Sequence, residues 1–386
     1  MKILINVTNA RHVGGGLQVV NNFLRKSALS ERADVEWFYA VSETLDKVYL
    51  DDDFKSRIAE DHYFVFPNQP DFRHTYCSVQ KQLRALENRI DPDVIFTILA
   101  PCYNFFKRKE VIRFVNAWVI GTNKYAWCTL HGLPKVKMFL HRLLIRLLLW
   151  RTDYFITQTN TIKQGLIKTL GKRDEVIRVV SNILPEIYRT MDNTPIVEDG
   201  RCHVVSVGSG AHKNLDIIPE VLHLLQQKHG IADVRFHVTL SDKAPELGVL
   251  KAKAEALGVQ ESIVNHGPLS QADLALLYRK STLCFLPSVL EVFSASTIEA
   301  MFFRLPTVAT DLSFNRDAFE DSCLYYTPMN AEQAAAQIAK LHQQQELRTQ
   351  LIEKMQTELL KFSDFDNYFH ETVNFLVEVG NQQIKR

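Results

Sequence analysis

Two glutamates, Glu291 and Glu299, lie eight positions apart in the stretch L-E-V-F-S-A-S-T-I-E-A-M. The residues between them that could line a small anion site are Phe293, Ser294, Ala295, Ser296 and Thr297. A helix that begins at Ser294 or Ser296 would direct its first backbone N–H groups, and the positive end of its dipole, towards a diphosphate. Glu299, one turn into that helix, could accept hydrogen bonds from two vicinal hydroxyls, as a ribose presents them. Glu291 would face the other side of the diphosphate, where a donor sugar would lie.

The same residues also fit a purely structural interpretation. Ser296 and Glu299 have the spacing of a capping box, in which the glutamate hydrogen-bonds back to the N–H of the capping serine. On these twelve residues alone the two interpretations are equal, and the neighbouring stretches favour the ligand site.

A second loop with useful chemistry follows the strand expected at 203–207, in the stretch V-G-S-G-A-H-K-N. Gly208, Ser209 and Gly210 shape a turn from strand to helix, and Lys213 stands at its helical end. A lysine there could reach a phosphate, with help from the helix dipole. The alternative is a solvated lysine next to an asparagine that caps the helix.

A third loop, after the first expected strand, contains Gly14, Gly15 and Gly16. Three consecutive glycines allow a tight turn and a close approach of backbone N–H groups to a ligand. The spacing is not the G-x-G-x-x-G of dinucleotide-binding domains. A turn that merely saves space is therefore as good an interpretation as a ligand loop.

Short apolar runs alternate with longer helical patterns through nearly the whole chain. The expected strands are 2–7, 35–40, 62–66, 93–98, 111–115, 153–157, 176–180, 203–207, 234–239, 262–266, 283–287, 307–310 and 323–326. Runs that are apolar on both faces and separated by helices are typical of buried parallel strands in α/β domains. The alternation breaks at 181–201, which holds two prolines and several charges. We therefore predict two Rossmann-like domains that face each other across a cleft, with ligands at the carboxyl ends of the strands.

The composition excludes several classes of protein. The chain has 386 residues, of which 46% are apolar and 23% charged, as in two ordinary folded domains. Its 45 basic and 44 acidic residues leave no overall field that would attract nucleic acid. Six scattered cysteines without metal-ligand spacing, and the lack of an apolar run of ~18 residues, predict a reduced cytoplasmic protein without a spanning segment.

Several stretches between about residues 176 and 328 resemble, in order, the family 4 retaining glycosyltransferases, which have the GT-B fold. P-S-V-L-E-V-F-S-A-S-T-I-E-A-M is similar to the family's E-x7-E motif after a P-S, and F-R-L-P-T-V-A-T resembles the strand that follows it. V-G-S-G-A-H-K-N resembles the family's G-x-x-x-x-K-N loop. The N-terminal half is similar only in plan and in its glycine loop, as expected where acceptors differ.

This resemblance implies a division of the chain into four parts. They are an acceptor-binding domain at 1–185, a linker at 186–201, a nucleotide-sugar-binding domain at 202–362, and a C-terminal helix at 363–386 that crosses back to the first domain.

The resemblance also implies a role for each matching residue. Glu299 would bind the donor ribose, Glu291 the donor sugar and Lys213 the diphosphate, with Glu291 and Lys213 acting as the catalytic residues. Backbone N–H groups from Ser294 to Thr297 would complete the phosphate site. Such enzymes need no metal or cofactor besides the nucleotide-diphosphate sugar that they consume, because the helix dipole and basic side chains stabilise the leaving group.

Several positions depart from the family pattern, and two of them bear directly on the chemistry. Ser209 stands where relatives often have an arginine, so Lys213 would act alone or with another basic residue such as Arg11 or Lys124. Asn116 stands where many relatives carry a histidine near the donor sugar, which leaves the chemistry of the N-terminal cleft loops open.

The stretch 133–151 is strongly apolar and carries basic residues but no acidic one. A helix of this kind suits the surface of an anionic membrane. The alternative is a core helix of the first domain whose basic face is solvated. On the first interpretation the acceptor is a lipid-linked glycan at the cytoplasmic leaflet, and the resemblance implies bacterial surface polysaccharide, such as the O-antigen of lipopolysaccharide.

The predicted function is a hexosyltransferase of the retaining type, and two others remain open. A GT-B sugar-nucleotide epimerase would interconvert donors without an acceptor, and the E-x7-E spacing argues against it. A non-catalytic GT-B partner subunit would bind nucleotide without turnover. The balanced charge argues against a nucleic-acid partner.

Overall fold

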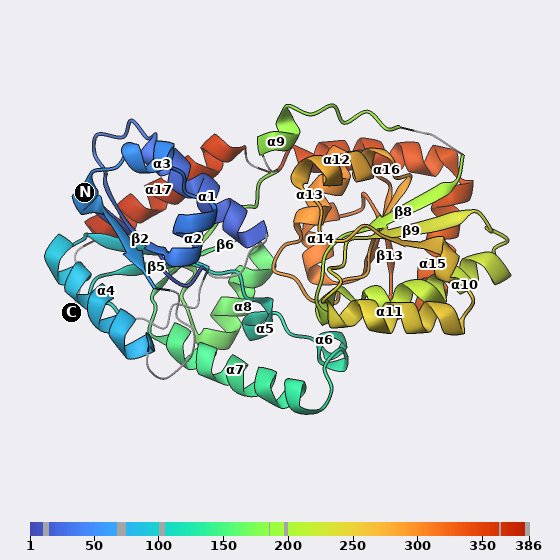
Figure 1. Cartoon of the computed structure of the whole chain (residues 1–386), viewed down its shortest axis with the longest axis horizontal. Helices are drawn as coiled ribbons and strands as arrows, with labels where there is room; N and C mark the ends of the chain where they lie inside the picture. Colours follow the sequence, from blue (N-terminus) through green and yellow to red (C-terminus); the bar gives the residue numbers. More distant parts are fainter. Residues whose placement is uncertain are drawn as a thin grey trace. The chain divides into compact units, whose positions relative to one another are not determined.

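The computed structural model describes residues 1–10, 15–67, 75–99, 105–184, 186–196, 200–362 and 364–382. The chain forms two compact units (Figure 1). The first contains Met1–Ile120, Leu140–Ser181 and Asp366–Arg386, and the second contains Gly121–Phe139 and Asn182–Phe365. The segment Gly121–Phe139, placed by sequence within a continuous first domain, is thus grouped with the second unit.

The first unit is built on a parallel sheet of seven strands in the order β3-β2-β1-β4-β5-β6-β7. The strands are β1 (Lys2–Val7), β2 (Glu36–Ser42), β3 (Tyr63–Phe66), β4 (Val94–Ile98), β5 (Glu110–Arg113), β6 (Tyr154–Thr157) and β7 (Ile177–Val179). Its helices are α1 (Gly15–Ala28), α2 (Glu43–Val48), α3 (Asp52–Ser56), α4 (Thr75–Ile90), α5 (Ala117–Ile120) and α8 (Asn160–Leu170), with most of α7 (Gly132–Trp150) and α17 (Phe365–Asn381).

The C-terminal helix α17 packs on the first unit, although most of the second unit precedes it in sequence. Phe369 lies with its ring centroid 5.1 Å from that of Phe23 in α1. The Arg178 guanidinium, in β7, pairs with Glu378 at 2.7 Å. The apolar face of α17 is therefore buried against the first unit, including α1.

The second unit is built on a parallel sheet of six strands in the order β10-β9-β8-β11-β12-β13. The strands are β8 (Cys202–Ser206), β9 (Val234–Val238), β10 (Ile263–Asn265), β11 (Leu283–Leu286), β12 (Thr307–Thr310) and β13 (Leu324–Tyr326). Its helices are α6 (Lys124–Cys128), α9 (Glu186–Arg189), α10 (Ile218–Lys228), α11 (Pro245–Ala256), α12 (Gln271–Arg279), α13 (Ala295–Phe302), α14 (Ser313–Phe319), α15 (Ala331–Gln343) and α16 (Gln345–Leu359).

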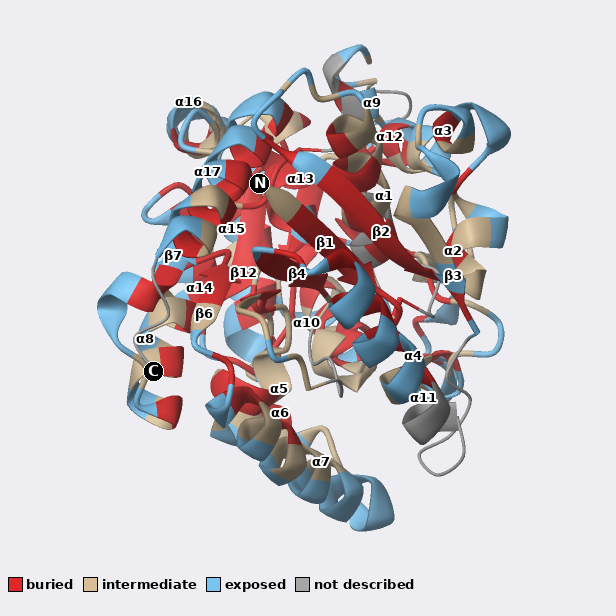
Figure 2. Cartoon of the chain, turned by 90° about the vertical axis from the view of Figure 1, so that its left-hand side faces the viewer, coloured by how far each residue is buried: buried red, intermediate tan, exposed pale blue. Residues whose placement is uncertain are grey.

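The central strands of both sheets are buried on both faces, as their apolar sequences predict. Figure 2 shows β1, β2 and β4 coloured as largely buried in the first unit. In the second sheet, consecutive residues alternate between two hydrophobic clusters: Val204 belongs to one and Val205 to the other. All thirteen strands predicted from the sequence are present, most with ends shifted by one or two residues.

Helix α7 differs from a core helix, because most of its large apolar side chains are exposed. Those exposed are Leu133, Val136, Phe139, Leu140, Leu143, Leu147 and Trp150. Their spacing of three or four residues places most of them along one face, while Ile145 and Leu149 are buried. Figure 2 shows α7 coloured mostly as exposed or intermediate. The interpretation of 133–151 as a core helix is therefore wrong for this apolar face. Among the described residues, no helix is long and apolar enough to cross a membrane.

Candidate active site

The strand order of the second sheet identifies where a ligand would bind. From β8 the chain proceeds outwards to β9 and β10, then returns to place β11 on the other side of β8. The chain therefore leaves the carboxyl ends of the neighbouring strands β8 and β11 in opposite directions. In open α/β sheets ligands bind in the crevice between two such loops. These two loops contain the residues that the sequence singled out.

The loop after β8 needs glycine at two positions. Gly208 has φ +120°, and a Cβ there would lie 2.7 Å from Cε of Lys213, so the lysine side chain crosses directly over the glycine. Gly210 has φ +101°, and a Cβ there would lie 2.8 Å from the ring of His212. Asn214 follows with φ 52°, a conformation that asparagine tolerates better than most residues. Glycine is required here by backbone conformation and by the close packing of the loop's own side chains.

The two loops meet in an ion pair between Lys213 and Glu291. The Lys213 Nζ lies 2.6 Å from Glu291 Oε1, and the two side chains are only 15% and 13% exposed. The pair is therefore shielded enough for its charges to interact more strongly than surface charges do. The prediction of a merely solvated lysine at this position is wrong, because Lys213 is partnered and largely buried. Next to the pair, burial lowers the pKa of His212.

The loop that carries Glu291 is fixed by hydrogen bonds to its backbone. The Thr310 hydroxyl, at the end of β12, donates to the carbonyl of Ser288 at 2.7 Å. Asn315 donates to the same hydroxyl oxygen at 2.9 Å, which orients it. The N–H of Val289 donates to the carbonyl of His212 at 2.8 Å, so the loops after β8 and β11 are directly joined.

Helix α13 begins beside this loop, and its first N–H groups have no side-chain cap. Ser294 is the capping residue, but its hydroxyl accepts no hydrogen bond from the helix. Ala295, the first helical residue, is exposed, whereas Ser296 and Thr297 are buried. The first N–H groups of a helix lack partners within the helix, so this end retains its capacity to bind an anion. The capping box predicted as the alternative is wrong, since Ser296 is not the cap.

Glu299 lies inside the second unit instead of reaching back to the helix start. It is 6% exposed, and its Oε2 accepts a hydrogen bond of 2.7 Å from the hydroxyl of Tyr278 in α12. Burial raises the pKa of Glu299, an effect opposed by the Tyr278 hydrogen bond and by the positive charge of Lys213. Burial and, to a smaller extent, the neighbouring Glu299 carboxylate raise the pKa of Tyr188, in α9. Neither tyrosine was singled out from the sequence, because an isolated tyrosine in an apolar stretch predicts only core packing.

Two further predicted residues have different surroundings. Phe293 packs against Phe362, with ring centroids 5.4 Å apart, so its ring anchors the loop. Ser209 is exposed at the tip of the loop after β8.

Of the residues predicted from the first half of the chain, Gly15, Gly16 and Asn116 follow strands of the first sheet. Gly15 and Gly16 are the first two residues of helix α1, so they belong to the helix and not to a loop before it. Asn116 lies between β5 and α5 and is half-buried. Gly14 and Arg11 lie outside the described residues. Lys124 is exposed, with its Nζ 5.0 Å from the ring centroid of Tyr125.

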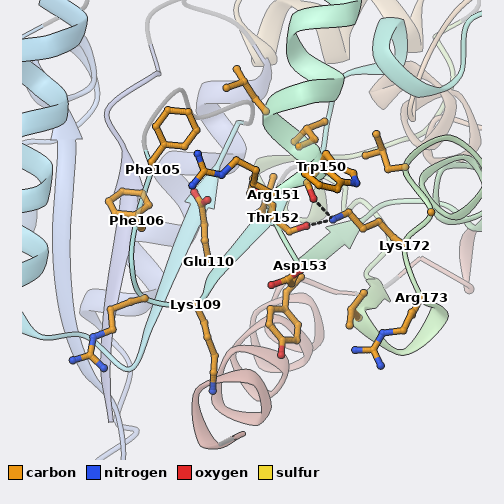
Figure 3. A pocket seen from close by; sticks show the side chains of 18 of the residues that line it. Phe105, Phe106, Lys109, Glu110, Trp150, Arg151, Thr152, Asp153, Lys172 and Arg173 are labelled. Carbon is orange, nitrogen blue, oxygen red and sulfur yellow. Dashed lines mark hydrogen bonds between the residues drawn. The ribbon is translucent and has the colours of Figure 1, made fainter. Parts of the chain in front are cut away.

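A cavity of about 1000 Å³ lies in the first unit, at the amino ends of β5 and β6 (Figure 3). Its basic lining residues are Lys107, Arg108, Lys109, Arg151, Lys172 and Arg173. Lys172 donates to the carbonyls of Trp150 and Thr152, at 2.8 and 2.5 Å, where α7 ends. Lys109 donates to the carbonyl of Val379 near the end of α17, at 2.9 Å. These lysines offset the negative ends of two helix dipoles, and the cavity is at the opposite edge of the sheet from the predicted ligand loops.

Comparison with known proteins agrees with this geometry. Residues 193–358 match the family described as glycosyl transferases group 1. The matched residues all lie within the second unit. Together with the relatives below, the match indicates a glycosyltransferase enzyme and confirms the resemblance seen in the sequence.

One curated relative is the O-antigen chain mannosyltransferase RfbU of Salmonella typhimurium, 21% identical over 240 residues. The alignment covers 61% of this chain and 63% of RfbU, so it spans a little under two thirds of that protein.

Two solved structures resemble this chain over nearly its whole length. HepE from Anabaena, solved in complex with UDP-glucose, has a TM-score of 0.68 at 15% identity and covers 98% of this chain and 100% of its own. WaaG, a glycosyltransferase involved in lipopolysaccharide biosynthesis, has a TM-score of 0.68 at 14% identity, with 97% and 99% covered. At these identities the likeness shows the fold, which is GT-B, with two Rossmann-like domains.

Proposed function

We propose that the protein transfers a hexosyl group from a nucleotide-diphosphate sugar to a glycan acceptor with retention of anomeric configuration. The observation that carries the proposal is the partly buried Lys213–Glu291 pair. It joins the loops after β8 and β11, at the place in the second sheet where the strand order reverses direction. The lysine and the glutamate held together there match the two parts of such a donor, its diphosphate and its sugar. The phosphates need positive charge, and the sugar hydroxyls need an acceptor.

In this proposal each group contacts one part of the donor. Glu299 accepts hydrogen bonds from the ribose hydroxyls, and Glu291 accepts them from the sugar. Lys213 and the uncapped N–H groups at the start of α13 bind the diphosphate and stabilise the negative charge that develops on it as the glycosidic bond breaks. They perform this without a metal ion. Attack of the acceptor hydroxyl on the same face as the leaving diphosphate, whose oxygen takes the proton, retains the configuration.

The donor proposal draws support from HepE, a protein with the same fold whose structure contains UDP-glucose. The ion pair must open for the donor to bind, because Glu291 is at present paired with Lys213 and would then accept hydrogen bonds from the sugar. A diphosphate supplies the competing negative charge for the lysine. Donor binding would thus exchange one partly buried pair for two charge-assisted contacts.

We place the acceptor at a membrane surface, at the inner face of the cytoplasmic membrane. Helix α7 supports this, since it exposes an apolar face with Trp150 69% exposed and contains no acidic residue. Lys135 and Lys137 are exposed beside that face, whereas Arg142 and Arg146 point inwards and donate to the carbonyl of Val119. Apolar surface bordered by lysines binds anionic bilayers. A lipid-linked glycan of the O-antigen or lipopolysaccharide type is the acceptor that this surface and the relative RfbU together favour.

The experiment that tests the proposal is calorimetry with UDP, GDP, dTDP and their common sugar conjugates on wild type and Glu299→Ala. Micromolar binding of one diphosphate, lost in a variant that keeps its fold by circular dichroism, would support the donor site and identify the base. Equal binding by wild type and variant, or no binding at all, would remove the proposal's main support. Incubation of the preferred donor without acceptor serves as the control for epimerase activity, and we expect no interconversion.

A further inference from the structure

Asn123, immediately before α6, has both polar atoms of its side chain engaged. Its Oδ1 accepts from the N–H of Ala126 at 3.0 Å and so caps α6. Its Nδ2 donates to the carbonyl of Val289 at 2.8 Å, across 166 positions of sequence. Both residues belong to the second unit. Nothing in the sequence around Asn123 predicts this second contact.

Val289 is the residue through which the two ligand loops are joined. It is fully buried, and its N–H donates to the carbonyl of His212 at 2.8 Å. His212 directly precedes Lys213, and Val289 lies two residues before Glu291. The contacts therefore form a closed circuit: Asn123 holds Val289, Val289 holds the loop after β8, and the two loops meet again at the Lys213–Glu291 pair.

Glu291 follows Val289 by two residues, so the path of the backbone at Val289 helps to set the direction of the Glu291 side chain. The preceding carbonyl, of Ser288, is fixed by Thr310. The Val289 carbonyl is fixed by Asn123, so neither peptide plane can rotate without leaving a polar group of the buried loop unpaired. Removing the Asn123 donor would free the Val289–Leu290 peptide plane, one peptide before Glu291, while leaving the Ser288 contact in place.

We propose that Asn123 is a positioning residue for the donor sugar: through Val289 it sets the carboxylate of Glu291. The inference rests on the proposed contact of Glu291 with the sugar. Asn123 itself touches no reacting atom. A change at Asn123 would alter recognition of the sugar portion of the donor. The diphosphate and the ribose are contacted by Lys213, α13 and Glu299 instead.

The variant Asn123→Asp isolates the contact. Aspartate caps a helix as well as asparagine does, so α6 keeps its cap, but a carboxylate oxygen replaces Nδ2 and faces the Val289 carbonyl. Asn330→Asp is the matched control. Asn330 caps α15 through its Oδ1, which accepts from the N–H of Gln333 at 3.0 Å, and it has no role in either ligand loop. Each variant makes the same chemical change at a helix cap.

The first measurement is hydrogen–deuterium exchange of the ligand-free proteins. We expect the peptide covering 288–294 to exchange about tenfold faster in Asn123→Asp, and to be unchanged in Asn330→Asp. Unchanged exchange in Asn123→Asp would overturn the inference whatever the protein's function.

The second measurement compares dissociation constants for the nucleoside diphosphate and for its sugar conjugate. We expect Asn123→Asp to weaken the conjugate by about tenfold and the diphosphate by less than about twofold. Equal weakening of both ligands would mean that Asn123 only maintains structure, and it would overturn the inference. If wild type binds neither ligand, the proposed function fails and the inference fails with it. A failure of the proposed function alone is recognised because residues 288–294 would still exchange faster in Asn123→Asp, although wild type binds neither ligand.

Discussion

The hydroxyl of Tyr278 donates a hydrogen bond of 2.7 Å to the Glu299 carboxylate, inside the second unit. Tyr278 is fully buried, and its ring stacks on Phe303 with centroids 5.3 Å apart. The tyrosine thus holds one carboxylate oxygen of Glu299 in a fixed direction. The same bond favours the charged carboxylate, against the burial that raises the pKa of Glu299. A charged, oriented carboxylate is the form that can accept two hydrogen bonds from a ribose.

Tyr278→Phe is expected to weaken nucleotide binding in a pH-dependent way. Removing the hydroxyl removes a contact that lowers the pKa of Glu299, so the pKa rises further and less of the carboxylate is charged at neutral pH. We expect an affinity loss of about tenfold at pH 7 that becomes smaller as the pH is raised towards 9. Calorimetry with the preferred nucleoside diphosphate between pH 6 and 9 measures this.

Tyr326→Phe provides the control for that variant. Tyr326 is equally buried, but its hydroxyl has no hydrogen-bond partner in the described part of the chain, and it is not among the groups that affect Glu299. We expect unchanged nucleotide affinity at every pH. A pH-independent loss in Tyr278→Phe, or the same loss in both variants, would contradict a specific role for the Tyr278–Glu299 contact.

Gly208→Ala is expected to abolish diphosphate binding by displacing Lys213. The backbone at Gly208 has φ +120°, and an added Cβ would lie 2.7 Å from the lysine Cε. The strained conformation would cost about 1–3 kcal/mol of folding free energy. Gly258→Ala is the control, because Gly258 has φ +68° with no atom within 4 Å of an added Cβ. It should lose stability in thermal unfolding yet bind the diphosphate normally. Normal diphosphate binding by Gly208→Ala would show that Lys213 can bind the diphosphate without lying over residue 208.

The members of the Lys213–Glu291 pair should have separable effects on binding and turnover. Lys213→Met removes the cation proposed for the diphosphate, and we expect the affinity for nucleoside diphosphate to fall by about tenfold or more. Glu291→Gln keeps the shape of the side chain, so diphosphate affinity should change by less than about threefold while kcat falls by about a hundredfold or more. Isothermal calorimetry and initial rates on the same preparations measure both. Equal loss of diphosphate affinity in the two variants would contradict this division of roles.

The sequence predicted the strands well because buried parallel strands require apolar side chains on both faces, a pattern that is visible without a structure. It also singled out the two loops that meet in the Lys213–Glu291 pair, since they follow strands and carry glycine, lysine and glutamate. It could not predict Tyr278, Asn123 or Thr310 as partners of those loops. Their contacts join positions that are distant in sequence and depend on the packing of α12, α6 and β12, which no local pattern encodes. The sequence likewise could not show that one apolar face of α7 is exposed, because an apolar helix has the same sequence pattern whether protein or lipid covers it.

Glu110 is expected to make the stability of the first unit depend on pH. It lines the cavity, accepts a hydrogen bond from Thr97 at 2.5 Å, and has its pKa raised by burial to about 7. Because the folded-state pKa is above the ordinary value of a glutamate, this group stabilises the fold fully below about pH 4.5, and the contribution is lost as the pH rises through 7. Glu110→Gln should remove that loss, which is at most about 3 kcal/mol.

Urea unfolding of wild type and Glu110→Gln at pH 5, 6, 7 and 8 tests the Glu110 prediction. We expect the difference in unfolding free energy between variant and wild type to increase in favour of the variant across this range. A difference that is constant with pH would mean that Glu110 titrates like an exposed carboxylate.

Membrane binding by α7 should depend on its exposed apolar face and on anionic lipid. Leu143→Asp combined with Leu147→Asp places two charges in the middle of that face, where both leucines are more than half exposed, so folding should be little affected. We expect wild type to sediment with vesicles of anionic phospholipid and the double variant to remain in the supernatant. Zwitterionic vesicles, or ~0.5 M salt with anionic ones, should weaken wild-type binding, because the lysines beside the face act electrostatically.

The control is Leu360→Asp with Val249→Asp, a pair of exposed apolar residues elsewhere. If the control pair also abolished sedimentation, or if the α7 pair did not, the membrane would have to be contacted through another part of the protein.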